Sequence, residues 1–404
     1  MTLVEFVPPT PHPLWKLCPQ MGITDVVVKV NPDLTGLPDP WRYETLSSIV
    51  SRLKSVGLNV VGLEGDPFDM TPIKEYGGLV GARLRHARGP LRERPLPSER
   101  DEAIKHYREL LESMGKLGIK LLCYNFMVGK GWSRTGVREV RGGAKATYFS
   151  LKELTPKESD GSANASPTQN VGALAKTSDK SELKISHEQV WANYEYFIKA
   201  VMPTAEKCGV RMALHPDDPC LPSLGGYARI FGSVEAYDRA YALYPSPSNA
   251  ITFCQANFKL MLGNGDCFGH KEQEEQKRVA NSTRSTRSTR QSNPVNPVNP
   301  VQTLEDAARH FGKRIAFIHV RDVEGTKEDF TELFHDQGDT DQFTLMRTYR
   351  ELGLDVPLRG DHVPEMAYDR ELTPEGTPGY FTLGRLFANG YLKALLKGTL
   401  AAAH

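Results

Sequence analysis

Short apolar segments alternate with longer helical patterns along most of the chain. Eight segments of four to six residues are rich in Val, Ile, Leu and Phe. Their hydrophobicity is continuous rather than alternating, which is typical of strands buried on both faces, as in parallel sheets. These predicted strands are Val4–Val7, Asp25–Val30, Asn59–Glu64, Lys120–Asn125, Val210–His215, Ala250–Cys254, Ile315–Val320 and Val356–Gly360.

Apolar residues recur at helical spacing between the predicted strands. The segment Tyr43–Gly57 places Leu46, Ile49 and Leu53 on one face, and Gly57 is a suitable C-terminal cap. Capping boxes, in which Ser or Thr is followed three residues later by an acidic residue or Gln, indicate the starts of further helices. These pairs are Ser98 with Asp101, Ser186 with Gln189 and Thr303 with Asp306, and helical patterns also cover Phe343–Gly353 and Tyr380–Lys397.

This alternation predicts an α/β fold, a (β/α)₈ TIM barrel in which residues 1–404 form one domain. A doubly wound open sheet is the alternative, but no GxGxxG follows a predicted strand.

Two stretches interrupt the alternation of predicted strands and helices. Residues 155–184 predict an insertion or lid, and residues 263–301, with STRSTRSTR and NPVNPVNPV, predict a disordered low-complexity insertion. The Arg repeat could bind an anionic partner, although a solvated loop is favoured.

Composition narrows the function classes. Of 404 residues, 39% are hydrophobic and 25% charged, which is typical of a soluble globular protein. Lys and Arg number 50 and Asp and Glu 49, so no general attraction to nucleic acid or anionic membranes is expected. No signal peptide is recognised, and no apolar run approaches the roughly 18 residues of a membrane span. The six cysteines form no CxxC, which predicts reduced thiols in a cytoplasmic enzyme; a homo-oligomer is compatible with the sequence.

Four candidate metal ligands stand at the ends of consecutive predicted strands. His215, Cys254, His319 and Asp361 would meet at the C-terminal face of a barrel, where active sites of this fold lie. Imidazole and thiolate ligands favour Mn²⁺, Fe²⁺, Zn²⁺ or another divalent transition metal over Mg²⁺ or Ca²⁺. Taken singly, each residue also has a structural explanation, since a Cys in an apolar strand is often a core residue and Asp361 suits a turn. Their coincidence at four strand ends favours a metal site.

Other polar residues at the same edge suit an anionic, hydroxylated ligand. Arg321 can hold a carboxylate through two parallel hydrogen bonds, or it can form an ion pair with Asp322 or Asp217. Candidate hydroxyl-binding and pocket-lining residues are Asn125, Asp218, Glu64 and Trp132, each of which could instead stabilise the loop in which it lies.

Several segments resemble the mannonate dehydratase family of sugar-acid lyases, which have a xylose-isomerase-like TIM barrel. They are LHPDDP, TFCQ, HVRDV, GDTD and DHVPEM, together with CYNFM at Cys123–Met127, WSRT at Trp132–Thr135, and Trp191–Pro219. The likeness covers roughly half of the chain, within Gly118–Thr135, His187–Leu262 and Thr303–Leu396. The chain departs from the family pattern at Val4–Pro9, at Ala256 and in LEGDP at the third strand end.

The resemblance implies roles for individual residues. Metal ligands of the family, which uses Mn²⁺ or Fe²⁺, match His215, Cys254, His319 and Asp361. The acid/base pair of the family matches His362 and Tyr380, and Arg321 stands where the family contacts its substrate. The implied reaction converts D-mannonate to 2-dehydro-3-deoxy-D-gluconate and water in hexuronate breakdown.

The sequence is therefore compatible with three alternative functions. The first is the implied dehydratase of D-mannonate, a small sugar acid. The second is a metal-dependent sugar isomerase or epimerase, or a dehydratase of another sugar acid. The third is an inactive sugar-acid-binding or scaffold protein, against which the retention of the candidate ligands together with His362 and Tyr380 argues.

Overall fold

The computed structural model describes residues 1–31, 36, 39–77, 95–129, 131–154, 183–263 and 301–401. The predicted insertions at 155–184 and 263–301, including both tripeptide repeats, therefore lie almost entirely outside the described residues.

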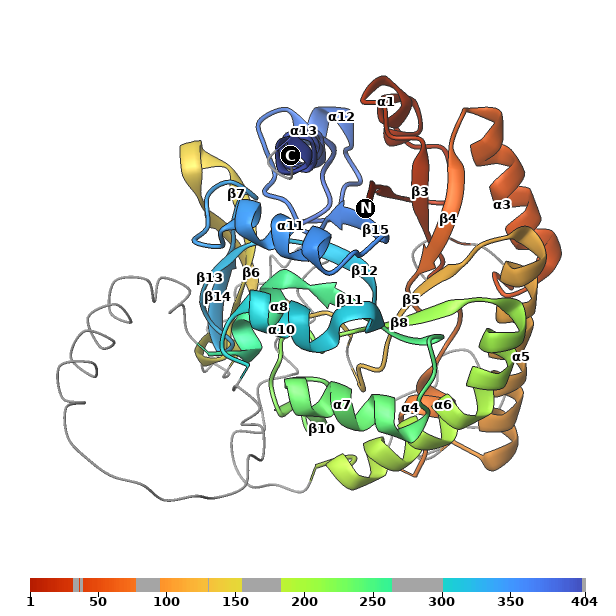
Figure 1. Ribbon diagram of the computed structural model, residues 1–404. Coiled ribbons are helices and arrows are strands. Elements are labelled where there is room, and N and C mark those ends of the chain that lie inside the picture. Colours follow the sequence, from red (N-terminus) through yellow and green to blue (C-terminus); the bar gives the residue numbers. More distant parts are fainter. Residues whose placement is uncertain are drawn as a thin grey trace, which may run out of the picture.

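A parallel sheet curls into a barrel (Figure 1), which confirms the predicted fold class. Its first strand is divided into β1 (Thr2–Leu3), which pairs with the last strand, and β2 (Glu5–Val7), which pairs with β3. Between them, the Val4 N–H donates to the Leu358 carbonyl at 2.8 Å and joins the two edges. The other strands are β3 (Asp25–Lys29), β4 (Asn59–Glu64), β5 (Leu121–Asn125), β8 (Arg211–His215), β11 (Asn249–Cys254), β12 (Ile315–Val320) and β15 (Pro357–Gly360).

Helices cover the outside of this barrel (Figure 1). The long ones follow individual strands, as the repeated strand–helix pattern predicts. They are α3 (Tyr43–Ser55), α5 (Pro97–Leu117), α6 (His187–Cys208), α7 (Val234–Leu243), α10 (Leu304–Phe311), α11 (Gln342–Glu351) and α13 (Thr382–Ala401). Shorter helices are α1 (Leu14–Gln20), α4 (Thr71–Lys74), α8 (Gln255–Met261) and α12 (Asp369–Leu372).

The helix starts confirm two of the three predicted caps. Thr303 and Asp306 form a reciprocal capping box, and the Ser186 hydroxyl accepts from the Gln189 N–H at 3.3 Å. The cap predicted at Ser98 is wrong, because α5 already begins at Pro97, whose fixed φ suits the first helical position. The Glu99 carboxylate instead accepts from the Leu96 N–H at 2.8 Å.

Two apolar layers hold the barrel together. Strand residues that point outward pack against the helices, whereas inward-pointing ones fill the barrel interior, because successive side chains of a strand face opposite sides. The interior cluster consists of Val4, Phe6, Val27, Leu121, Cys123, Ala213, Ala250, Ala316 and Phe317, with Val61 and Tyr380 against it. This packed interior lies beneath the C-terminal rim of the barrel.

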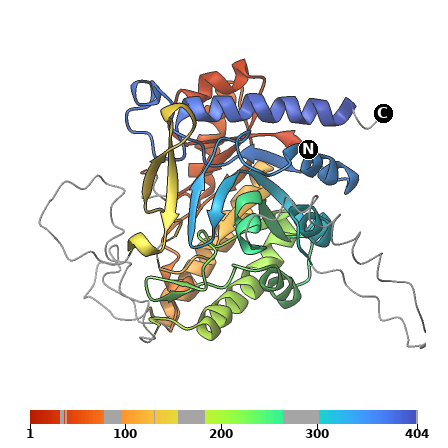
Figure 2. The same ribbon diagram turned by 90° about the vertical axis from the view of Figure 1, so that its left-hand side faces the viewer.

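A four-stranded antiparallel sheet stands beside the barrel and was not predicted (Figure 2). It consists of β6 (Gly136–Glu139), β7 (Lys145–Ser150), β13 (Val323–Thr326) and β14 (Asp329–Glu332), in the order β13-β14-β7-β6. These short strands follow β5 and β12 and lack the continuous apolar pattern of the barrel strands. A two-stranded hairpin, β9 (Ser223–Leu224) with β10 (Tyr227–Ala228), follows β8.

The described cysteines, Cys18, Cys123, Cys208, Cys220 and Cys254, are all free thiols, in agreement with the predicted absence of a disulfide framework. Among the helices in the described ranges, none has the length and apolarity needed to cross a membrane.

Candidate active site and metal centre

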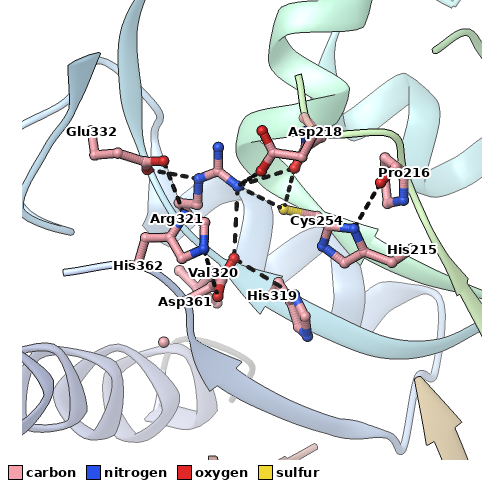
Figure 3. A network of polar contacts seen from close by, with 12 residues as sticks. His215, Pro216, Asp218, Cys254, His319, Val320, Arg321, Glu332, Asp361 and His362 are labelled. Atoms are coloured by element: carbon pink, nitrogen blue, oxygen red, sulfur yellow. Dashed lines mark hydrogen bonds and ion pairs between the residues drawn. The ribbon is translucent and has the colours of Figure 1, made fainter. Parts of the chain in front are cut away.

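The four predicted metal ligands come together at the C-terminal rim of the barrel (Figure 3). His215 and Cys254 end β8 and β11, His319 lies near the end of β12, and Asp361 directly follows β15. These strands are neighbours in the barrel, and Cys254 is in register with His319. One ligand atom of each residue lies within 4.8 Å of the corresponding atoms of the other three. The strand register thus brings four residues that are distant in sequence to one point.

The imidazole of His319 is the strongest sign that this cluster holds a ligand. The residue is fully buried, and neither ring nitrogen makes a hydrogen bond within the part of the chain that the structure describes. Its Nδ1 lies 3.7 Å from Asp361 Oδ2, and its Nε2 lies 3.5 Å from Glu64 Oε2. A buried polar group without a hydrogen bond is costly, and a metal ion would satisfy it.

His215 is oriented in the manner of a metal ligand. Its Nδ1 donates to the Pro216 carbonyl at 2.8 Å, so the lone pair stays on Nε2. Burial, followed by the neighbouring His319, lowers the pKa of His215 to about 4 and keeps the ring neutral. A neutral imidazole with a free lone pair is the form that binds a metal.

Cys254 supplies the sulfur of the cluster. Its thiol donates to Asn257 Oδ1 at 2.9 Å, and Arg321 Nη1 lies 3.7 Å from the sulfur. Burial raises the pKa of Cys254 to about 12. The thiol must therefore lose its proton when a metal binds, and the nearby guanidinium favours the resulting thiolate. The combination of two imidazoles, a thiolate and a carboxylate fits a divalent transition metal.

Arg359 links Asp361 to Glu64. It donates to Asp361 Oδ1 at 2.9 Å and to both oxygens of Glu64, at 2.7 and 3.2 Å. Burial alone would raise the pKa of Asp361, but His362 and Arg359 hold it well below its ordinary value. For Glu64, the Arg359 charge, together with the contact to His319, outweighs burial and lowers the pKa to about 2. Both carboxylates are therefore ionised.

His362 and Tyr380 face each other beside the metal cluster. The His362 Nε2 lies 2.9 Å from the Tyr380 hydroxyl, and Tyr380 also lies 3.4 Å from Asp361 Oδ1. Burial, with the Asp361 charge, raises the pKa of Tyr380 well above its usual value and keeps the phenol protonated. The pair that the resemblance implies thus forms a hydrogen bond between an imidazole and a phenol.

Behind His362 lies a group that we call the arginine–carboxylate cluster, formed by Arg134, Asp218, Arg321 and Glu332. Arg134 donates to Asp218 at 2.7 Å and to Glu332 at 2.5 Å. Arg321 donates to the same carboxylates, at 2.8 and 2.7 Å. Burial opposes ionisation, but the two guanidiniums lower the pKa of Glu332 to about 2 and that of Asp218 below its ordinary range. Two positive charges therefore balance two negative ones in a buried position.

A cavity of about 110 Å³ opens beside these groups. Among the predicted substrate contacts, Glu64, Asn125, Trp132 and Asp218 line it, as do His215, Asp361, His362 and Tyr380. Arg321 does not line the cavity and is fully buried. Its ion-pair partners are Asp218, Glu332 and, at 3.7 Å, Asp361, rather than Asp322 or Asp217. Its Nη2 has no hydrogen-bond partner in the described ranges, and a direct contact between Arg321 and substrate stays a prediction.

Two residues that line the cavity have donor groups available for a ligand. The Asn125 Oδ1 accepts from Lys74 Nζ at 3.0 Å and from the Met127 N–H at 3.1 Å. The amide nitrogen of Asn125 therefore points away from these two donors. The Trp132 Nε1 is buried and has no hydrogen-bond partner in the described ranges. The Trp132 ring packs edge-on against His362, with centroids 5.0 Å apart.

Sequence reasoning missed Arg359 and Glu332. A signal for Arg359 was present, because a charged residue inside an apolar strand needs a buried partner. Glu332 comes from the unpredicted sheet, and no local pattern pointed to it.

A barrel with a histidine, cysteine and carboxylate cluster at the carboxyl ends of its strands belongs to the class of barrel enzymes that have a metal centre. Residues 96–267 and 271–403 match the sequence model described as D-mannonate dehydratase (UxuA). The chain therefore belongs to the D-mannonate dehydratase family, which consists of metal-dependent hydro-lyases that act on a small sugar acid. This result confirms the predicted resemblance.

Individual relatives agree with the family match. The chain is similar to the mannonate dehydratase of Streptococcus equi subsp. zooepidemicus, with 30% identity over 75% of this chain and 74% of the relative. It is 28% identical to that of Brachyspira hyodysenteriae, over 93% and 91% of the two chains. The fold matches the crystal structure of mannonate dehydratase from Streptococcus suis serotype 2, with a TM-score of 0.71, 24% identity and coverage of 100% and 94%.

Proposed function

We propose that the protein dehydrates D-mannonate to 2-dehydro-3-deoxy-D-gluconate and water, as a step in hexuronate breakdown. The observation that carries this proposal is the buried imidazole of His319, which makes no hydrogen bond within the described residues and belongs to a four-ligand cluster. Two members of this cluster, His215 and Asp361, line the same cavity as His362 and Tyr380. A bound ion would complete the ligand cluster, and the histidine and tyrosine supply the acid and base that a dehydration needs.

His215, Cys254, His319 and Asp361 would hold the ion, which we propose to be Mn²⁺ or Fe²⁺. When bound, such an ion supplies Lewis-acid stabilisation of negative charge next to the substrate carboxylate. This help matters because removal of a proton α to a carboxylate places a second negative charge beside the first.

His362 and Tyr380 divide the proton transfers. We assign His362 as the base that removes the C2 proton and Tyr380 as the acid that protonates the departing C3 hydroxyl, which leaves as water. The remaining enol rearranges to the 2-keto acid. The hydrogen bond between the two side chains lets the proton return from the histidine to the tyrosine after each turnover.

Asn125 and Trp132 orient the substrate. Both line the cavity, and both offer N–H groups to the carboxylate or hydroxyl oxygens of a sugar acid. Glu64 and Asp218 also line the cavity, but their oxygens already accept from Arg359 and from Arg134 and Arg321. We therefore propose that these two carboxylates shape the pocket and that the amide and indole make the polar contacts.

The test is a coupled measurement of substrate and metal. The protein is freed of metal with a chelator, reloaded with Mn²⁺ or, under anaerobic conditions, Fe²⁺, and incubated with D-mannonate and a panel of other aldonic acids. We expect a 2-keto acid from D-mannonate, identified by NMR, and none without metal. If only a different aldonic acid is turned over, D-mannonate is not the substrate. If no keto acid forms under any condition, the protein is not a lyase, and a binding protein is favoured instead.

A further inference from the structure

The Glu332 carboxylate lies directly against the His362 ring, on the side away from Tyr380. Glu332 Oε1 is 2.9 Å from His362 Nδ1, while His362 Nε2 is 2.9 Å from the Tyr380 hydroxyl. Both Glu332 and His362 are buried. The two ring nitrogens therefore face different partners, and the position of the ring proton follows from what each partner can donate or accept.

The arginine–carboxylate cluster keeps Glu332 ionised and fixed. Its Oε2 accepts from Arg321 Nε at 2.7 Å, and its Oε1 accepts from Arg134 Nη2 at 2.5 Å (Figure 3 shows the contacts of Glu332 with Arg321 and His362). An ionised carboxylate has only lone pairs to offer. A contact of 2.9 Å with Nδ1 is thus attractive only if Nδ1 carries a hydrogen.

Arg134 does not offer an alternative donor to that nitrogen. Its Nη2 lies 3.3 Å from His362 Nδ1. However, the two hydrogens on Nη2 are already directed to Glu332 Oε1, at 2.5 Å, and to Asp218 Oδ2, at 3.0 Å. No Nη2 hydrogen is left for Nδ1 to accept.

We propose that Glu332 is a positioning residue that selects the Nδ1–H tautomer whenever the His362 ring is neutral, so that the Nε2 lone pair points to Tyr380. The inference rests on the proposed function, in which His362 Nε2 takes the substrate proton. A carboxylate that orients the base of a catalytic pair acts in the same way in Ser–His–Asp triads, where a wrong tautomer abolishes most of the turnover. Here the carboxylate comes from β14, outside the barrel.

The kinetic test uses Glu332→Gln with Glu5→Gln as the matched control. A glutamine at 332 offers both an acceptor and a donor, so it no longer imposes one tautomer. Glu5 is also buried and paired, to Arg385 at 2.5 Å and to Asn389, but it is not among the residues that line the cavity. We expect Glu332→Gln to lower kcat by about a hundredfold or more, with KM changed less than about threefold and metal content unchanged. Glu5→Gln should keep the kcat of the wild type.

The spectroscopic test reports on the tautomer without any turnover. Nitrogen-15 NMR of histidine-labelled protein loaded with diamagnetic Zn²⁺ distinguishes a ring protonated on Nδ1 from one protonated on Nε2, and the His362→Gln spectrum assigns the resonances. We expect Nδ1–H in the wild type and in Glu5→Gln, and a mixture or the Nε2–H form in Glu332→Gln.

Two results would overturn the inference. One is a wild-type His362 with a proton on Nε2, alone or together with one on Nδ1. The other is a Glu332→Gln enzyme whose kcat stays within about threefold of the wild type. Failure of the proposed function is a separate result, because a protein that does not dehydrate D-mannonate can still show the expected Nδ1–H resonance and its loss in Glu332→Gln.

Discussion

Two buried polar clusters flank the same cavity, and they differ in how their hydrogen-bonding capacity is used. In the ligand cluster of His215, Cys254, His319 and Asp361, both ring nitrogens of His319 lack a hydrogen bond in the described part of the chain. In the arginine–carboxylate cluster, both carboxylates accept from both guanidiniums, and of the side-chain nitrogens only Arg321 Nη2 is without a partner in the described ranges.

This difference distinguishes a cluster that binds a ligand from outside the chain from a cluster that holds neighbouring side chains in place. A buried polar group without a partner costs about 1–3 kcal/mol, so the ligand cluster is set up for a ligand from outside the chain. The arginine–carboxylate cluster satisfies its own charges and can hold neighbouring groups such as His362 in place without a ligand. Variants that remove one residue from each region should therefore have different consequences for metal content.

The largest effect is expected in the ligand cluster. Cys254→Ala removes the thiolate, so metal affinity should fall by more than about a hundredfold and turnover should fall with it, because even residues that only contact metal ligands contribute about 10–100-fold. Elemental analysis after gel filtration measures the metal. Cys18→Ala, which removes a buried thiol packed in the outer core, is the control and should keep its metal. Wild-type metal content in Cys254→Ala would show that the sulfur is not a ligand.

His362→Ala tests the region next to the arginine–carboxylate cluster. It removes the proposed base but none of the four ligands, so metal content should stay at the wild-type level. Turnover should fall by about two to four orders of magnitude, the usual contribution of a general acid or base. Steady-state kinetics together with elemental analysis measures both quantities. If metal is lost as well, the two regions are not separable in the way the contacts indicate.

The two regions also differ in how far the sequence could predict them. The barrel was predictable because its strands are buried on both faces and read as continuous apolar runs. The four ligands were predictable because each stands at or next to the end of such a run, and parallel strands bring these ends to one rim. Glu332 had no comparable signal. It ends β14, which pairs with β7 about 180 residues earlier, and its hydrogen bond to Arg134 spans 198 positions.

Two further predictions, the helix cap at Ser98 and the partners of Arg321, were also only partly correct or wrong. The Ser98 cap was a reasonable prediction from its spacing to Asp101, but the proline one residue earlier starts the helix instead. For Arg321, the sequence suggested a substrate contact or an ion pair with Asp322 or Asp217. The antiparallel sheet supplies Glu332 as its partner, which only the tertiary structure could show.

Acid should weaken the arginine–carboxylate cluster. The pKa of Glu332 is lowered to about 2 in the folded protein, below the roughly 4.3 of an unfolded glutamate. The unfolded chain therefore takes up the proton first as the pH falls, and the stabilisation is present above about pH 5 and lost progressively toward pH 2. Between pH 5 and pH 3, Glu332 alone should account for about 2 kcal/mol of lost unfolding free energy.

Denaturant unfolding of wild type and Glu332→Gln at both pH values isolates this contribution. The other carboxylates titrate in both proteins, so the smaller loss expected for the variant reports on position 332. Equal losses in the two proteins would mean that Glu332 is not ionised against the guanidiniums in the folded state.

The smallest effect concerns the cavity wall between the two clusters. Trp132→Phe removes the indole N–H but keeps an aromatic ring against His362. If that N–H donates to the substrate, one neutral hydrogen bond of about 1 kcal/mol is lost, and KM for D-mannonate should rise about fivefold with kcat nearly unchanged. Trp41→Phe is the matched control, since the Trp41 Nε1 is equally without a hydrogen-bond partner in the described ranges but stacks on His106 rather than lining the cavity. An unchanged KM in both variants would assign Trp132 to packing, and the substrate would then be oriented by Asn125 and the bound metal.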